Sequence, residues 1–296
     1  MVEDYGFDGL DMHYEIYTSV DESIVYLALL RELRAALNQH AENKQNGHRC
    51  LLTAVGSCSV GGRAKLRSKE MDQYLDFWNL LSYALCENGS RGHTANQAAL
   101  HSWQDEAMNV SLVVKWWIED GIDREKLVLG ISVTLRDVFL TSEGRLQQRS
   151  RTERRSTPDT WNDDIIGRCD YRALPLPGHK VYHDEYDVTC WSYHSEHQIM
   201  MSYDDETTAR VKGEYTAGRD QIDTNSDHHF PGRVLVEGPS LVTTVTNVMG
   251  DREYSQNWLD YDRSQFPNMA NGMRNWEQDD EGLDEGQYGE QYEDDE

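Results

Sequence analysis

Short, almost continuously apolar segments alternate along this chain with segments of helical periodicity, and this alternation limits the fold more than any other feature. Residues 50–55 (CLLTAV) and 126–133 (KLVLGISV) are typical of strands buried on both faces. Between them, residues 65–74 predict a short helix and residues 110–119 a longer one. Buried strands separated by helices favour a parallel sheet with helical crossovers. We therefore expect an α/β fold.

Local signals predict where several of these elements begin and end. Residues 5–14 predict a first strand, and Asp21 is expected to cap the helix that follows. Asn109 is expected to cap the helix at 110–119, and Gly121 to end it. The first helix has an apolar stripe made of Ile24, Leu27, Leu30, Leu33 and Leu37. Further elements are predicted as strands at 77–85 and 198–203 and as a last helix at 239–249.

Two regions depart from the alternation. Residues 138–197 are irregular and polar, which predicts an inserted subdomain within a domain that spans residues 1–273. The arginine-rich run at 145–155 is expected to be a solvated basic loop of this subdomain. Residues 274–296 are strongly acidic with few apolar side chains, which predicts a disordered tail.

The charge balance restricts the class of partner. The chain has 28 Lys and Arg residues against 53 Asp and Glu residues, a formal charge of −25. A polyanion is repelled by nucleic acid and by anionic membranes, so we expect neither as a partner. A neutral substrate such as a polysaccharide fits this charge. The acidic amino terminus is unlike a signal peptide, and no apolar run is long enough to span a membrane.

Cysteine and histidine spacing predicts neither a disulfide framework nor a metal site. The five cysteines are an odd number and form no C-x-x-C pair. The pairs His194/His197 and His228/His229 lack H-E-x-x-H spacing, and we expect them to be exposed loop residues. Of the adjacent Trp116 and Trp117, which could form a sugar platform, one is expected in the core.

The segment Asp8-Gly-Leu-Asp11-Met-His13-Tyr-Glu15 holds the candidate chemistry. Alternate side chains of a strand share a face, so Asp11, His13 and Glu15 would project together with Glu15 outermost. Taken alone, this spacing is also that of an acidic strand end without any chemistry.

Together with its surroundings, the segment resembles the D-G-x-D-x-D-x-E signature of family 18 chitinases. The resemblance continues in order down the chain. Residues 69–83 are similar to the family's stretch that ends in M-x-Y-D, and Gly92 to Asn96 are similar to its G-H-x-x-N motif. Arg136 matches the Arg of Y-G-R, and Ser202-Tyr203-Asp204 matches S-Y-D. Asp170 to Pro175 match a phrase of the family's insertion domain, and residues 259–273 match its closing segment.

The resemblance implies a (β/α)8 TIM-type barrel of which this chain holds about the last five βα units, with an α+β insertion. The incomplete barrel would leave open edges through which the chain could self-associate. The implied activity is substrate-assisted hydrolysis of β-1,4-linked N-acetylglucosamine in chitin, without a cofactor. Glu15 would be the acid, supported by Asp8 and Asp11. Secretion is implied as well.

Further implied roles concern the substrate. Tyr83 would contact the acetamido group of the sugar, and Arg136, Tyr203 and Asp204 would be further substrate-binding residues. All four positions come from the family resemblance.

Four positions differ from the family pattern. His13 replaces the orienting Asp, Ala84 replaces the Asp after Tyr83, Thr134-Leu135 replaces Tyr-Gly, and residues 220–227 contain no Trp. Removing one such stabilising group typically costs about 10²–10³ in rate. The resemblance therefore implies a chitinase with impaired activity. Two alternatives are a chitinase-like lectin that binds chito-oligosaccharides without cutting them, and an unstable remnant without function.

Overall fold

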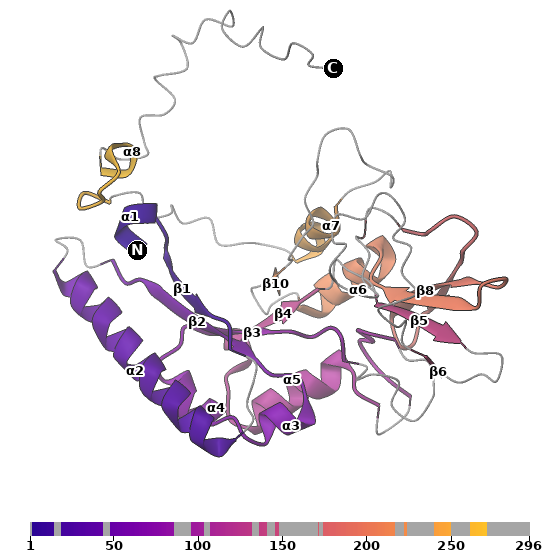
Figure 1. Ribbon diagram of the computed structural model, residues 1–296, viewed down its shortest axis with the longest axis horizontal. Helices are drawn as coiled ribbons and strands as arrows, with labels where there is room; N and C mark the ends of the chain where they lie inside the picture. Colours follow the sequence, from indigo (N-terminus) through magenta and orange to yellow (C-terminus); the bar gives the residue numbers. More distant parts are fainter. Residues whose placement is uncertain are drawn as a thin grey trace, which may run out of the picture.

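Two β-sheets organise the protein, as the computed structural model shows (Figure 1). The structure describes residues 2–14, 19–43, 48–85, 96–103, 107–131, 136–140, 146–147, 171, 174–216, 222–223, 240–249 and 261–270. In one sheet, parallel strands follow one another in chain order: β1 (Gly9–Met12), β2 (Leu51–Gly56), β3 (Phe77–Leu80), β4 (Leu127–Gly130) and β10 (Ile222–Asp223). This sheet confirms the parallel arrangement expected from the alternation.

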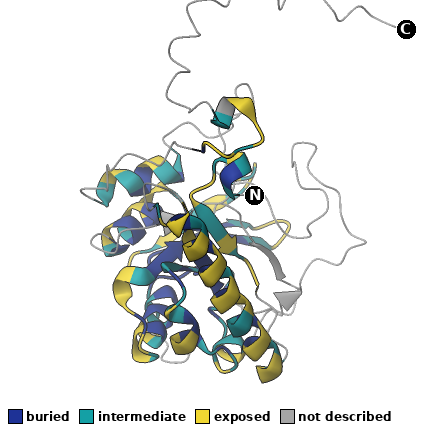
Figure 2. Ribbon diagram, turned by 90° about the vertical axis from the view of Figure 1, so that its left-hand side faces the viewer, coloured by how far each residue is buried: buried dark blue, intermediate teal, exposed yellow. Residues whose placement is uncertain are grey.

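One face of the parallel sheet is covered by the crossover helices (Figure 1). These are α2 (Val20–Glu42), α3 (Val60–Arg63), α4 (Ser68–Asp72) and α5 (Val110–Glu119), with a short 3-10 helix at Arg124–Lys126 before β4. Alternate residues of β2 and β3 point at these helices and are fully buried, namely Leu52, Ala54, Trp78 and Leu80. The main core therefore lies between the sheet and this helical layer, where Figure 2 shows the buried residues.

The first strand is shorter than predicted. Residues Val2–Tyr5 form a helical turn, α1, and only Gly9–Met12 are extended. The Phe7 amide donates to the carbonyl of Val2, and Gly6 takes a φ of +66° that ends the turn. The prediction of a strand over 5–14 is thus wrong at its amino-terminal end.

Helix α2 begins two residues earlier than predicted, and its buried face includes residues outside the predicted apolar stripe. Its cap is Ser19, whose hydroxyl accepts from the Glu22 amide at 3.3 Å, so the assignment of Asp21 is wrong. Leu30 and Leu37 are in the core as predicted, whereas Ile24 is 44% exposed. Leu27 and Leu33 also pack against the core, and the buried face includes Arg34 as well.

Arg34 is buried because every side of its guanidinium finds an acceptor. It donates to the carbonyls of Tyr74 and Cys50, at 2.9 Å each, and to Oδ2 of Asp76 at 2.5 Å. Asp76 also accepts from the Leu52 amide at 2.8 Å. This cluster attaches α2 to the amino-terminal ends of β2 and β3.

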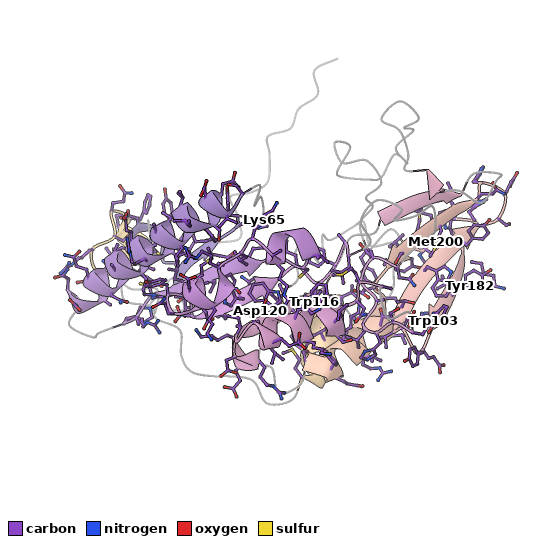
Figure 3. The ribbon with its side chains drawn as sticks, turned by 90° about the horizontal axis from the view of Figure 1, so that it is seen from below. Lys65, Trp103, Trp116, Asp120, Tyr182 and Met200 are labelled. Carbon is purple, nitrogen blue, oxygen red and sulfur yellow. The ribbon has the colours of Figure 1, made fainter. Side chains whose placement is uncertain are left out.

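The boundaries predicted for α5 are confirmed. Oδ1 of Asn109 accepts from the Leu112 amide at 2.9 Å, and Gly121 follows the helix with a φ of +90°. Trp117 is buried with its ring 4.9 Å from that of Trp78, so it is the core member of the tryptophan pair. Trp116 lies beside the Arg63 guanidinium, which also donates to Asp120, labelled with Trp116 in Figure 3.

The second sheet is antiparallel and lies between β4 and β10 in the chain. Its spatial order is β6 (Leu146–Gln147), β5 (Arg136–Leu140), β9 (Ile199–Tyr203), β8 (Thr189–His194) and β7 (Lys180–Asp184). The strand predicted at 198–203 is confirmed as β9. Figure 3 labels Tyr182 of β7 and Met200 of β9 on this sheet.

Two helices follow the antiparallel sheet. Helix α6 (Glu206–Thr216) was not predicted, whereas α7 (Leu241–Val248) confirms the helix expected at 239–249. The two helices pack closely, since a Cβ added to Gly213 would lie 2.6 Å from Cγ2 of Val248. A further short helix, α8 (Pro267–Ala270), lies beside α1 (Figure 1), so α7 is not the last helix.

Hydrogen bonds connect the two sheets. The Gln97 amide donates to Ser202 of β9 at 3.0 Å, and its carbonyl accepts from the Leu85 amide at 2.8 Å. Asn96, the last residue of the G-H-x-x-N phrase, donates to Thr189 of β8 at 3.2 Å. Asn96 therefore contributes to the junction between the sheets. Among the described residues, no helix has the length and apolar character to cross a membrane.

Candidate functional site

Asp11 lies in the middle of a polar row that crosses three neighbouring strands. Its neighbours Leu10 and Met12 pack against the helix-side core, so its carboxylate projects from the opposite face of the sheet. Oδ1 of Asp11 accepts from Thr53 Oγ1 at 2.5 Å and from Asn79 Nδ2 at 2.9 Å. Each donor comes from a different strand, β2 or β3, so the carboxylate is held by the sheet itself.

The register of the strands produces this row. Asp11 is the pairing partner of Thr53, and Asn79 that of Val55. In β2 and β3 the residues that flank Thr53 and Asn79 point at the helices, so these two side chains share the face of Asp11. Sequence reasoning missed Thr53 and Asn79. The available signal was a single polar residue at an alternate position in an otherwise apolar strand.

His13 occupies the next alternate position beyond the end of β1 and is exposed. The strand end is fixed by Tyr26 of α2, whose hydroxyl donates to the carbonyl of Met12 at 3.1 Å. The ring of Tyr26 lies 5.3 Å from that of Tyr14. Glu15 lies outside the described residues, so its position beside Tyr83 stays a prediction.

Tyr83 lies in the loop after β3 and covers the end of β4. The Ser82 hydroxyl donates to the carbonyl of Gly130 at 2.8 Å. A Cβ added to Gly130 would lie 2.8 Å from Cε1 of Tyr83, so glycine gives the ring room to approach the strand. Because carboxyl ends of parallel strands meet at one edge, Tyr83 and His13 belong to the same edge. The following residue, Ala84, has a φ of +55°.

Asp8 lies at the other end of β1. It precedes the strand, and its carbonyl accepts from the Leu51 amide at 2.8 Å. Burial, assisted by the charge of Asp8, raises the pKa of the Tyr261 hydroxyl. Asp8 is thus near Tyr261 at the amino edge of the sheet, and the structure does not bring it together with His13.

Tyr203 ends strand β9, Asp204 follows it, and both are buried. Oδ1 of Asp204 accepts from Lys212 Nζ at 2.5 Å, and burial raises the pKa of the Tyr203 hydroxyl. Arg136 begins β5 opposite Ser202, and its side chain lies outside the described part of the chain. Tyr203 and Asp204 are thus part of the packing around the second sheet, and contact of all three residues with a sugar stays a prediction.

The carboxyl edge of the parallel sheet therefore offers a carboxylate with two fixed donors, an exposed imidazole and a phenol. Such groups can hydrogen-bond a neutral polar ligand, and the carboxylate can stabilise positive charge that develops above it.

Comparison with known proteins identifies relatives of one kind. The model of the family Glycosyl hydrolases family 18 matches residues 1–221. Chitinase 1 of Aphanocladium album is 27% identical over 276 residues, which cover 92% of this chain and 63% of that protein. The chain therefore spans 63% of the length of this curated relative.

Solved structures share the fold of this chain. The class V chitinase of Nicotiana tobaccum superposes with a TM-score of 0.68 and 25% identity, covering 84% of this chain and 70% of that one. YKL-39, solved in the presence of chitooligosaccharides, superposes with a TM-score of 0.71 and 23% identity, covering 84% and 71%. These neighbours imply a (β/α)8 TIM-type fold, with which the parallel sheet and its crossover helices agree.

Proposed function

Because the chain belongs to glycosyl hydrolase family 18, we propose that it binds chito-oligosaccharides at the carboxyl edge of the parallel sheet and cleaves them slowly. The observation that carries this proposal is the Asp11 carboxylate, which Thr53 and Asn79 hold on the open face of β1. A carboxylate fixed by two donors from a rigid sheet is oriented before any ligand arrives.

The proposed reaction is substrate-assisted, as in the family. Glu15 protonates the oxygen of the leaving sugar, while the carbonyl oxygen of the substrate's own acetamido group attacks the anomeric carbon. The resulting oxazolinium is cationic, so the negative charge of Asp11 stabilises it. The Tyr83 hydroxyl hydrogen-bonds the acetamido group. Water then attacks the anomeric carbon of the oxazolinium with retention of configuration and gives a proton back to the Glu15 carboxylate.

Two substitutions support slow rather than fast turnover. His13 stands where the family orients the acetamide with a carboxylate, and a protonated imidazole there would repel the oxazolinium. Ala84 removes a second carboxylate beside Tyr83. Each loss is expected to cost about 10²–10³ in rate. The exposed His13 side chain still has a nitrogen that can accept a hydrogen bond when neutral.

The alternative function is binding without cleavage. It is supported by the retention of Asp11 and Tyr83 where two carboxylates are lost. The fold is also similar to that of YKL-39, which was solved in the presence of chitooligosaccharides. In this case the row of Asp11, Thr53 and Asn79 would bind the sugar and take no part in cleavage.

We also propose that the parallel sheet is an open portion of a barrel. Among the described residues β1 and β10 are its outer strands, and a closed barrel of this type needs eight strands. An open strand edge pairs readily with another chain, so we propose that the protein self-associates through β1. We also propose an extracellular location, where chitin is found.

The test measures binding and turnover separately. Calorimetric titration with the tetramer of N-acetylglucosamine gives the dissociation constant, and a fluorogenic chito-oligosaccharide gives the rate. We expect measurable binding, a low rate that Glu15→Gln abolishes, and a rate about 10²-fold higher in His13→Asp. The control is His101→Asp, which makes the same change on a residue outside this edge.

The outcomes separate the two functions. Binding without turnover in the wild type and in His13→Asp would establish the binding function instead. Turnover that Glu15→Gln leaves intact, or binding that Asp11→Ala leaves unchanged, would contradict the proposed site.

A further inference from the structure

Three side chains with different donor atoms converge on one face of the antiparallel sheet. His183 of β7 is the pairing partner of Cys190 of β8, and Cys190 is that of Tyr203 in β9. Asp205 lies just beyond the end of β9, and its Oδ2 is 2.6 Å from Nε2 of His183. A ring nitrogen of His183, Sγ of Cys190 and a carboxylate oxygen of Asp205 all lie within 4.8 Å of one another.

The spacing of these atoms suits a tetrahedral metal ion. Zinc lies about 2.0–2.3 Å from nitrogen, oxygen and sulfur ligands, which places its ligand atoms roughly 3.3–3.8 Å apart. Nε2 of His183 is now 2.6 Å from Oδ2 of Asp205, so this pair would open slightly around an ion. Cys190 is fully buried and His183 is exposed, so an ion would enter from the side of the imidazole.

The carboxylate is already oriented by a second set of contacts. Oδ1 of Asp205 accepts from the Thr208 amide at 3.0 Å, and the Asp205 amide donates to the Thr208 hydroxyl at 2.9 Å. These bonds at the start of α6 occupy Oδ1 and leave Oδ2 directed at His183. Ligands oriented in this way by outer contacts are typical of metal sites.

We propose that His183, Cys190 and Asp205 form a binding site for one divalent ion of the zinc class. A mixture of imidazole, thiolate and carboxylate donors favours Zn²⁺ over the harder Mg²⁺ and Ca²⁺. On binding, the Cys190 thiol releases its proton to solvent as the sulfur–metal bond forms. The ion would join β7, β8 and the start of α6, with a water molecule in the fourth position. This proposal does not depend on the glycosidase function.

The experiment uses the full chain after removal of metals with a chelator. Titration with Zn²⁺ against a chromophoric chelator should give one ion per chain. Co²⁺ in place of Zn²⁺ should give a thiolate-to-cobalt absorption band, which requires a cysteine ligand. Cys190→Ser should abolish this band, and His183→Ala should weaken Zn²⁺ binding by about 100-fold or more. His183 is exposed, so its replacement is not expected to disturb folding, which circular dichroism would verify.

Matched variants make the assignment specific. Cys58→Ser changes another buried cysteine, and His197→Ala changes a histidine in the neighbouring turn. Both should retain the stoichiometry and the affinity. Zn²⁺ should also raise the melting temperature of the wild type and not that of His183→Ala. A cobalt band that survives Cys190→Ser, a loss of binding in His197→Ala, or no Zn²⁺ binding by the wild type would overturn the proposal.

Discussion

Lys212 and Asp204 form a buried ion pair, with Nζ 2.5 Å from Oδ1 and side chains that are 7% and 3% exposed. The same ammonium group donates to the carbonyl of Ala98 at 2.5 Å. One cation therefore joins α6, the end of β9 and the segment that follows the G-H-x-x-N phrase. Removing one member of such a pair leaves a buried charge without compensation.

We predict that Lys212→Met lowers the free energy of unfolding by about 3–5 kcal/mol, because Asp204 then stays buried without its cation. Urea denaturation followed by circular dichroism measures this change. The matched control is Arg210→Met on the same helix, whose pair with Glu214 is about half exposed. That variant should change stability by less than about 1 kcal/mol. Equal effects in the two variants would contradict the prediction.

The second prediction concerns the backbone at Ala84, whose φ of +55° is unfavourable for a residue with a Cβ. Ala84→Gly should raise the free energy of unfolding by about 1 kcal/mol, because glycine adopts this conformation without a clash. Ala36→Gly, at an exposed position of α2, should lower it by about 0.5–1 kcal/mol. Replacing alanine by glycine should therefore change the free energy of unfolding in opposite directions at the two sites. A destabilised Ala84→Gly variant would show that no strain is present.

The elements that sequence analysis predicted well are those whose signals are local. The apolar runs that became β2 and β4 and the cap at Asn109 depend on neighbours within a few residues. Helix α6 lacked such a signal because its buried face is largely polar, with Thr208, Lys212 and Thr216. Lys212 is buried only because Asp204 receives it, and that pairing is a property of the folded chain.

The candidate site was predictable only in part, because its contacts join residues that are far apart in the sequence. The family phrase indicated Asp11, but its partners Thr53 and Asn79 lie 42 and 68 residues away in the sequence. Which residues face Asp11 depends on the register of three strands, and a shift of one residue would turn Thr53 to the other face. The cluster of His183, Cys190 and Asp205 was not predicted either. Strand pairing brings these residues together, and their spacing in the sequence matches no short metal-binding motif.

The third prediction is a loss of stability in acid that depends on His179. Burial, with the charges of His194 and His197, lowers the pKa of His179 below its usual 6.5. The folded state thus disfavours protonated His179. The free energy of unfolding is therefore unaffected by this group above pH 6.5 and falls as the pH drops below that value. His179→Gln should lose less stability than the wild type between pH 7.5 and pH 5. Chemical denaturation at several pH values measures this difference.

A second variant identifies the cause of the acid effect. His197→Gln removes one neighbouring charge while leaving His179 in place, so its loss of stability should lie between those of the wild type and His179→Gln. If all three proteins lose stability equally in acid, the histidine group is not responsible for the effect.

The last prediction tests the polar row on the open face of the parallel sheet. Thr53→Val keeps a β-branched side chain in β2 and removes the hydroxyl that donates to Asp11. A hydrogen bond to a charged group contributes about 1.5–3 kcal/mol, so a less firmly oriented carboxylate should weaken oligosaccharide binding about tenfold. Calorimetric titration with the tetramer of N-acetylglucosamine measures the affinity.

The control for this variant is Thr246→Val in α7, which also removes a hydroxyl hydrogen bond, to the carbonyl of Thr243 at 3.2 Å. It lies away from the row and should leave the affinity unchanged. Asn79→Leu, which removes the second donor to Asp11, should weaken binding to a similar extent as Thr53→Val. Because the two donors reach the same oxygen from different strands, the double variant should lose more affinity than either single variant. Unchanged affinity in all of them would mean that the sugar is bound elsewhere and that the row serves only to connect β1, β2 and β3.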